Sequence, residues 1–309
     1  MSCQDGPAPA WIMLAVLAAG CDGGGRAAPV PLPAAELVFS AKRGADYQLF
    51  SIGLAGSAPV PLTDGPGQHL HPSVSPDGHQ VAYTCESEGL RAICLLDRRS
   101  SSSTALGLAP LLASTPSFSP DGTALVFEGQ GAIDAQPDVY LVDLDRALAP
   151  RRLTADEGRD GGPVFAPDGK HIYFVSNRSG SFEIWRMTRD GAQQAPVTQG
   201  AAIIGRPAPT ADGQALAYAR SLPGDASSEI VRLTLGSRAI EVLVEADASE
   251  PALSADGRWL AFATRRYGDP DLALVELGTG GAAQRLTSDP NLEGAPCFSP
   301  AQPPRDASR

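Results

Sequence analysis

A short turn sequence recurs along this chain at a nearly constant interval. Each copy ends in Asp-Gly, with proline directly before the aspartate in three of five copies, at residues 75–78, 119–122, 166–169, 210–213 and 254–257, and a degenerate sixth copy begins at Ser299. Proline presets φ, aspartate stabilises the turn and glycine allows a positive φ, so a β-hairpin is expected at each copy. Successive aspartates stand 44 to 47 residues apart. Such a period is typical of a β-propeller, in which each repeat forms one blade.

Strand-like segments recur in register with this turn. After each turn comes an apolar run ending in an aromatic residue, as in Val81-Ala82-Tyr83 and Ile172-Tyr173-Phe174. Unbroken runs of this kind suit strands that are covered on both faces. A third strand follows, often after an acidic residue such as Glu183. A fourth, outer strand is marked by Leu-Thr or Val-Thr pairs at 62–63, 153–154, 197–198 and 286–287, with weaker versions near Leu111 and Leu243.

A proline-containing strand precedes each turn and indicates how the repeats close. These prolines are Pro72, Pro116, Pro163, Pro207, Pro251 and Pro296. The first repeat begins at Leu37 without such an inner strand, whereas the chain ends on an unmatched one, Pro296-Cys297-Phe298. We therefore predict an all-β fold, a six-bladed β-propeller of four-stranded antiparallel blades over residues 36–300. The C-terminal strand is expected to join the first blade and close the ring.

One blade carries a family resemblance. The segment from Gly162 to Gly169, followed by 172–180 and Glu183-Ile184-Trp185, closely resembles the TolB-type propeller repeat, and the resemblance covers nearly all of the chain after its N-terminal segment. It implies the six-bladed fold but no single activity, because this repeat serves many roles. TolB proteins contact a peptidoglycan-associated lipoprotein in an envelope-spanning assembly, which implies a protein or peptide partner. TolB itself has an α/β domain ahead of its propeller, whereas here only a short segment separates Cys21 from Leu37.

The N-terminal segment has the pattern of an export signal. An apolar stretch at 11–20 is too short to span a bilayer comfortably and ends in small residues before Cys21. This resembles a bacterial lipobox, which implies that residues 1–20 are a signal peptide and that Cys21 carries a lipid anchor. A plain signal peptide with an incidental cysteine is the alternative. The Gly-, Pro- and Ala-rich residues 21–35 predict a flexible tether, and residues 301–309 are expected to be disordered.

The composition fits an exported protein that does not bind nucleic acid. The 309 residues carry a formal net charge of −11, which disfavours both nucleic acid and an electrostatic hold on anionic lipid. Membrane attachment would therefore come from the lipid on Cys21. No apolar run after the leader approaches the length of a membrane span, so no second span is expected. A monomer facing the periplasm or the cell exterior is predicted.

Three cysteines lie beyond the leader. Cys85 and Cys94 belong to the second and third strands of one blade, and pairing about the turn at 88–90 would place them side by side. A disulfide suits an oxidising compartment, but directly opposed strand residues often have poor disulfide geometry, so both states stay open. Cys297 is interpreted as a small buried hydrophobe rather than a nucleophile.

Familiar catalytic and cofactor motifs are absent from the sequence. It contains no Gly-x-Ser-x-Gly, His-Glu-x-x-His, glycine-rich phosphate loop or Cys-x-x-Cys, so no catalytic residue and no cofactor are assigned. The turn aspartates could suggest a ring of calcium sites, but their place in hairpin turns explains them without metal.

A group of polar residues is expected where the inner strands enter the central channel. The residues before the recurring prolines are His71, Thr115, Gly162, Arg206, Glu250 and Ala295, and His69, Asp160 and Glu293 stand two residues further out. Two histidines and several carboxylates near one axis could hold a divalent cation or a polar ligand. The simpler alternative is a set of solvated charges at a wet channel mouth. The predicted ligand-binding residues are His69, His71, Asp160, Arg206, Glu250 and Glu293, and no metal site is assigned.

Three function hypotheses follow from these features. The first is a lipid-anchored cell-envelope protein that holds a protein or peptide partner on its propeller. The second is a channel-mouth enzyme, a lyase or hydrolase acting on polysaccharide, although no catalytic motif supports it. The third is a small-ligand sensor subunit, which would need a membrane partner for signalling.

Overall fold

The structure is a computed structural model that describes residues 36–300 apart from 55–56, 132–134, 147–148, 223, 225–226 and 289–292. All these residues belong to the second of two units into which the chain divides, Leu32–Arg309. The predicted signal peptide, Cys21, the tether and the 301–309 tail lie outside the described residues. In the described part, no helix is long and apolar enough to cross a membrane.

The described residues form β-strands joined by turns and loops. The strands of the first half are β1 (Glu36–Arg43), β2 (Asp46–Gly53), β3 (Val60–Pro61), β4 (Gln68–Val74), β5 (Gln80–Ser87), β6 (Leu90–Asp97), β7 (Ser102–Ala105), β8 (Leu112–Phe118), β9 (Ala124–Gln130), β10 (Asp138–Asp143), β11 (Arg151–Arg152) and β12 (Asp160–Phe165). Those of the second half are β13 (His171–Ser176), β14 (Glu183–Thr188), β15 (Ala195–Pro196), β16 (Ile203–Pro209), β17 (Ala215–Ser221), β18 (Ser228–Thr234), β19 (Ile240–Val244), β20 (Ala248–Leu253), β21 (Trp259–Thr264), β22 (Asp271–Glu276), β23 (Gln284–Arg285) and β24 (Glu293–Ser299).

These strands form an all-β propeller of small antiparallel blades. Four blades are separate four-stranded sheets, β8–β11, β12–β15, β16–β19 and β20–β23. The other eight strands form one sheet, in which a single parallel pair, Tyr47 with Gln68, joins β2 to β4. The prediction of six separate sheets is therefore wrong. The repeat could not reveal this bridge, because it depends on contacts between two successive repeats, among them Asp46 with the Gly67 amide and Gln68 with the Ala45 carbonyl.

The two ends of the described part meet in one sheet. Strand β24 pairs antiparallel with β1, so that Phe298 lies opposite Leu37 and Cys297 opposite Val38, which is the pairing the sequence predicted. Strands β1 and β2 also pack against β21 and β22, with Phe39 and Trp259 in one apolar cluster. The N-terminal strands are thus held by the last part of the propeller on two sides.

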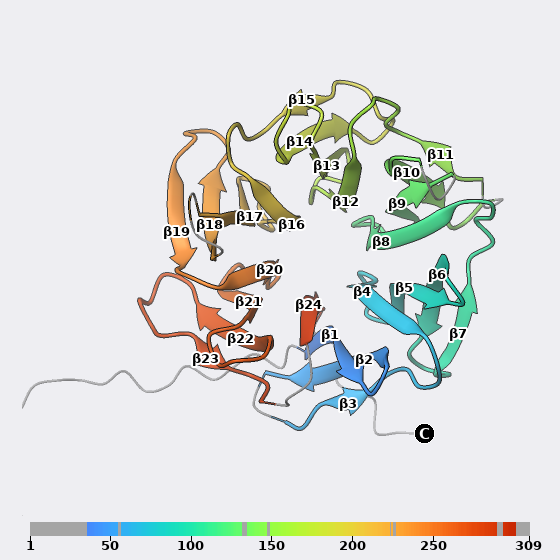
Figure 1. The fold of residues 1–309 in the computed structure, drawn as a ribbon, viewed down its shortest axis with the longest axis horizontal. Helices are drawn as coiled ribbons and strands as arrows, with labels where there is room; N and C mark the ends of the chain where they lie inside the picture. Colours follow the sequence, from blue (N-terminus) through green and yellow to red (C-terminus); the bar gives the residue numbers. More distant parts are fainter. Residues whose placement is uncertain are drawn as a thin grey trace, which may run out of the picture. The chain divides into compact units, whose positions relative to one another are not determined.

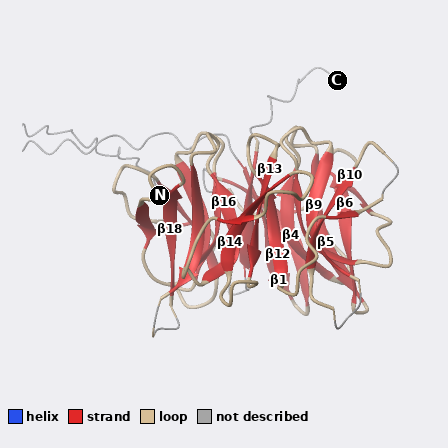
Figure 2. Ribbon diagram, turned by 90° about the horizontal axis from the view of Figure 1, so that it is seen from above, coloured by secondary structure: helices blue, strands red, loops and turns tan. Residues whose placement is uncertain are grey.

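The blades surround a central axis. Figure 1 shows β4, β8, β12, β16, β20 and β24 as the innermost strands, and each contacts the next around the axis. Apolar side chains fill the spaces between neighbouring sheets, as where Tyr173 and Ile184 pack against Tyr218 and Val231. Figure 2 shows that the strands run from one face of the ring to the other, so the loops gather at two faces.

The recurring turn is stabilised by hydrogen bonds from its own residues. In the copy at 119–122, Asp121 accepts hydrogen bonds from the Ser119 hydroxyl at 2.5 Å and from the Thr123 amide at 3.0 Å, and these bonds lower its pKa to about 2. Ser75, Thr210 and Ser254 donate in the same way to their own aspartates. These bonds give the turn aspartates a structural role within the hairpins.

A repeated threonine lies two residues after four of the outer strands, β3, β11, β15 and β23. The hydroxyls of Thr63, Thr154, Thr198 and Thr287 accept hydrogen bonds from third-strand amides at 2.8 to 2.9 Å. The Thr198 hydroxyl also donates to Glu183, which explains the acidic residue before the third strand. The outer strand expected near Leu111 is instead β7, because its exposed serines and threonine carry no apolar signal; Leu111 precedes β8.

Candidate functional site

A β-bulge interrupts each inner strand at the recurring proline. In β4, for example, pairing with β5 shifts register between Leu70 and Ser73. The residue before the proline has a positive φ at His71, Thr115, Gly162, Glu250 and Ala295, with values of 49° to 55°. This conformation is uncommon outside glycine, and bulges redirect side chains. The bulges therefore turn these residues toward the axis.

Strand β16 departs from this pattern. Three residues, 205–207, lie opposite one residue of β17, and the positive φ falls on Gly205 instead of Arg206. The other bulges place two residues opposite one, as at 71–72 in β4. Because of the additional residue, Arg206 projects further from the bulge. Its long side chain extends across the central axis.

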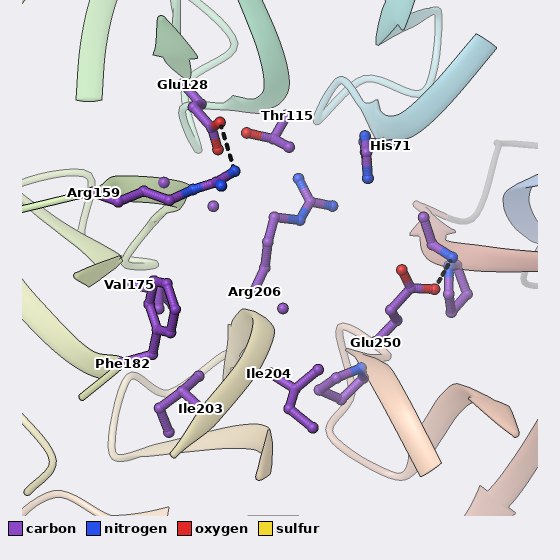
Figure 3. A pocket seen from close by; sticks show the side chains of 16 residues that line it. His71, Thr115, Glu128, Arg159, Val175, Phe182, Ile203, Ile204, Arg206 and Glu250 are labelled. Carbon is purple, nitrogen blue, oxygen red and sulfur yellow. Dashed lines mark hydrogen bonds and ion pairs between the residues drawn. The ribbon is translucent and has the colours of Figure 1, made fainter. Parts of the chain in front are cut away.

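The bulges enclose a cavity of about 400 Å³. Its lining includes His71, Arg206 and Glu250 of the predicted site residues, together with Thr115, Gly162 and Ala295. Figure 3 shows Arg206 extending between Thr115 and His71, with the Glu128–Arg159 pair to one side and Glu250 to the other. Residues far apart in sequence thus meet in one cavity, as the repeat predicted.

Arg206 spans the cavity to a blade that is not its neighbour. Its guanidinium donates a hydrogen bond to the Pro116 carbonyl of β8 at 3.1 Å. A Cβ atom on Gly162 would lie 2.9 Å from Arg206 Cγ, so glycine there leaves room for the arginine stem. Burial lowers the pKa of Arg206, and the neighbouring Cys297 and Glu250 oppose that shift. An arginine nevertheless stays protonated in proteins.

His71 and Thr115 bring two buried polar atoms to the same cavity. Neither His71 Nδ1 nor Thr115 Oγ1 has a hydrogen-bond partner among the described residues. Burial, and secondarily the charge of Arg206, lower the pKa of His71 to about 4. The imidazole is therefore neutral at pH 7 and can donate one N–H.

Backbone amides hold the two carboxylates of the cavity. The Ala295 amide donates to Glu250 Oε2 at 2.6 Å. Glu128, nearly buried on β9, accepts from the Gly162 amide and lies 3.6 Å from Arg159. A Cβ on Gly294 or Gly161 would come within 2.5 or 2.3 Å of these carboxylates. Burial raises the pKa of Glu128, which Arg159 counteracts.

The opposite wall of the cavity is apolar. Val175, Ile203 and Ile204 line it, together with Phe182, which precedes β14 and is 40 % exposed. Figure 3 shows Phe182 and Ile203 on the side away from His71 and Thr115. A partly exposed aromatic ring beside a cavity is typical of binding sites.

Three predicted site residues lie elsewhere. Glu293 is buried and lines a neighbouring cavity of about 560 Å³, which shares His71 and Glu250 with the first. His69 is outside both cavities, because its Nδ1 lies 2.9 Å from Thr63 Oγ1 and its ring packs edge-on against Tyr83. Burial lowers the pKa of His69, opposed by nearby aspartates.

Asp160 is also outside the cavity. It is fully buried at the start of β12, where Arg178 contacts its carboxylate at 2.7 Å. The Arg178 guanidinium also lies over the Trp185 ring. Asp160 therefore does not line the cavity, because its carboxylate is held by Arg178 instead.

Several lining residues could not be found from the repeat. Glu128 lies on a second strand, and Arg159 and Phe182 lie in loops, so none occupies the pre-proline position. The glycine pair Gly161-Gly162 was the available signal, since it marks a close approach of other side chains.

A third cavity, of about 400 Å³, lies at the turn ends of the inner strands. Ser75, Pro120 and Asp256 help to line it, and it shares no residue with the first two cavities. It lacks an arginine, lysine or histidine in its lining. The charged side chains are therefore concentrated at the other end of the inner strands, the bulge end. The cavity there, lined by His71, Arg206 and Glu250, is the bulge-end cavity.

The remaining candidates for chemistry in the described part are the cysteines and a metal site. Cys85 and Cys94 form a disulfide with a Cα–Cα distance of 5.8 Å. They are diagonal neighbours instead of a directly opposed pair, since Cys85 faces Ala92 and Cys94 faces Tyr83. Burial raises the pKa of the Cys297 thiol and so disfavours a nucleophilic thiolate. Over the described ranges, no group of three His, Cys, Asp or Glu side chains could hold a metal.

Comparison with known proteins places these features in one family. The family described as the TolB beta propeller domain matches residues 34–250. A TolB homolog of Chlorobium luteolum is 32 % identical over 156 residues, which cover 48 % of this chain and 33 % of the relative. The Tol-Pal system protein TolB of Bordetella pertussis is 27 % identical over 156 residues, covering 50 % and 35 %. The match thus spans about a third of the length of these two relatives.

A solved structure supports the fold independently. TolB from Acinetobacter baumannii superposes with a TM-score of 0.77 at 24 % identity, covering 86 % of this protein and 67 % of the other. At this identity the likeness concerns the fold alone. Together with the family match over most of the sequence, it leads to one conclusion: the chain belongs to the TolB β-propeller domain family.

Proposed function

We propose that this protein is an exported cell-envelope protein whose propeller holds a protein or peptide partner at the bulge-end cavity. The observation that carries the proposal is the cavity itself, in which Arg206, His71 and Thr115 face an apolar wall that includes the exposed ring of Phe182. A mixed polar and apolar cavity with an aromatic rim suits a peptide segment. The name of the Bordetella relative, a Tol-Pal system protein, supports an envelope setting.

The finer architecture belongs to this proposal. The eight-stranded sheet would act as two blades, because only one residue pair links its two antiparallel groups. The ring would then have six blades, with the β1–β24 pairing as its closure. A closed ring holds the six bulges at fixed positions, which a cavity shared among blades requires.

The membrane anchor is a separate part of the proposal. Residues 1–20 would be removed as a signal peptide, and Cys21 would carry the lipid, with 21–35 as the tether and the propeller as a monomer in the periplasm or outside the cell. Cys21→Ala should shift the protein from the membrane fraction to the soluble fraction, whereas Cys3→Ala, a matched change within the leader, should not. Retention of the Cys21→Ala protein in membranes after an alkaline wash would contradict the anchor.

Partner binding is tested by cross-linking in intact cells. The wild-type protein, the double variant Arg206→Gln/Phe182→Ala and the surface control Arg186→Gln are compared by affinity capture and mass spectrometry. Arg186 is exposed on β14, away from the cavity lining. A partner lost from the double variant and kept by the control supports the proposal. A set of captured proteins that is the same for all three proteins contradicts it.

A further inference from the structure

Arg206 is a partly buried cation whose charge has no ion-pair partner among the described residues. Its guanidinium donates to a neutral acceptor, the Pro116 carbonyl, and no carboxylate of the described residues lies within ion-pairing distance. Most of its five N–H donors therefore remain available to a ligand. The space for its side chain is provided by Gly162 on the neighbouring blade.

The carboxylates of the cavity do not satisfy this cation. Glu250 acts on Arg206 only through longer-range attraction, and its Oε2 accepts the Ala295 amide. Glu128 is engaged by the Gly162 amide and Arg159. Both are held in place by the bulges of the following blades. Within the described ranges no carboxylate neutralises this cation, which leaves that place to a ligand.

His71 Nδ1 and Thr115 Oγ1, which have no hydrogen-bond partner among the described residues, are also available to a ligand. A neutral imidazole donates through Nδ1–H in one tautomer, and the Thr115 hydroxyl is also a donor. Figure 3 shows the Arg206 guanidinium between these two side chains. The three side chains thus line the same cavity, and buried polar groups of this kind call for hydrogen-bond partners. A carboxylate offers only acceptors and one negative charge, which matches a single guanidinium better than a phosphate dianion does.

An apolar surface lies next to this donor group. Val175 and Ile203 are nearly buried, and Phe182 is partly exposed at their edge. The cavity of about 400 Å³ lies within the range of small-molecule sites. Its ligand should therefore combine an acidic group with an apolar one.

Building on the proposed function, we infer that the bulge-end cavity recognises a carboxylate adjacent to an apolar side chain of a peptide. Arg206, His71 and Thr115 bind the carboxylate, and Phe182 with Ile203 contacts the apolar group. The terminal carboxylate of a peptide and an Asp or Glu side chain both supply this chemistry.

The direct test compares matched probes by calorimetry and NMR titration. N-acetyl-phenylalanine carries the carboxylate and the ring, and N-acetyl-phenylalaninamide replaces the charge with a neutral amide. The acid is expected to bind in the millimolar range and about tenfold more tightly than the amide, because hydrogen bonds to charged groups are the stronger ones. Ac-Phe-Asp-NH2 against Ac-Phe-Asn-NH2 tests the side-chain source in the same way.

Variants assign the preference to its residues. Arg206→Gln should remove the tenfold preference for the acid, and Arg186→Gln should keep it. Phe182→Ala should weaken N-acetyl-phenylalanine about fivefold while leaving N-acetyl-glycine unchanged, since only the ring contact is lost. Circular dichroism checks folding, and Arg206→Lys, which keeps the charge but loses the forked donors, serves if Arg206→Gln does not fold.

Several results would overturn the inference. These are equal binding of acid and amide by the wild type, an acid preference that survives Arg206→Gln, or no binding of either acid at about 20 mM, well above the range that small ligands of this size reach in good sites. If the probes fail while the cross-linked partner is still lost from the double variant, the inference falls and the proposed function stands. If the probes succeed and no partner depends on the cavity, the proposed function falls instead.

Discussion

The two ends of the inner strands differ in how uniform they are. At the turn end, four of the five Asp-Gly turns use a Ser or Thr hydroxyl that donates the same hydrogen bond to the turn aspartate. At the bulge end, the backbone is also repeated, but the residues it presents are His71, Thr115, Gly162, Arg206, Glu250 and Ala295. The uniform end serves the fold, whereas the varied end builds one asymmetric cavity. Changes at the first should therefore affect stability alone, whereas changes at the second should affect binding as well as stability.

The largest expected effect is a pH dependence that originates at the bulge end. Because the folded-state pKa of His71 is about 4 and its ordinary value is 6.5, the unfolded protein binds more protons between these values. The free energy of unfolding should be fully present above pH 6.5 and fall by about 3 kcal/mol as the pH drops to 4. His71→Asn, which tolerates the positive φ, should remove this part of the pH dependence in urea unfolding at several pH values. Parallel pH profiles for the two proteins would contradict the burial of a neutral imidazole.

The next effect tests the glycine that admits Arg206. Gly162→Ala places a Cβ 2.9 Å from Arg206 Cγ at a residue with φ of 55°, and should lower the free energy of unfolding by about 2 kcal/mol. It should also displace Arg206 and abolish the preference for N-acetyl-phenylalanine over its amide. Gly131→Ala, in open space at an ordinary φ, is the matched control. An unchanged acid preference in Gly162→Ala would mean that Arg206 does not depend on this space.

The smallest expected effect concerns Asp121 at the turn end of the inner strands. Asp121→Ala removes acceptors of the Ser119 hydroxyl and Thr123 amide, and should cost about 1 kcal/mol in thermal or urea unfolding. Probe affinity should stay at the wild-type value, because Asp121 does not line the bulge-end cavity. Asp145→Ala, at an exposed aspartate without these bonds, should leave both quantities unchanged. A loss of probe affinity in Asp121→Ala would show that the two ends are not independent.

The sequence could predict the features that recur in each repeat, but it could not predict contacts that occur in one place only. The Asp-Gly turns, the inner prolines and the pairing of Cys297 with Val38 follow from elements present in every repeat or missing from one. The bridge between Tyr47 and Gln68 joins two successive repeats at one place only, so the recurring pattern does not reveal it. Of the residues expected to bind a ligand, His71, Arg206 and Glu250 line the cavity, and all three occupy the pre-proline position.

For the other residues, the direction of the side chain determines whether it lines the cavity. His69 and Asp160 were expected beside the bulge residues, but an extended strand directs them to Thr63 and Arg178. Glu128 and Phe182 reach the cavity from a second strand and a loop, which spacing within the inner strand cannot show.

The most direct test of the binding end is an amide chemical-shift map of the ¹⁵N-labelled protein titrated with N-acetyl-phenylalanine. The account predicts shifts at the amides of Thr115, Gly162 and Ala295, which line the bulge-end cavity, and none at Gly78, Gly122 and Gly257 of the turns. Shifts that concentrate at the turn glycines, or that spread evenly over both ends, would contradict it.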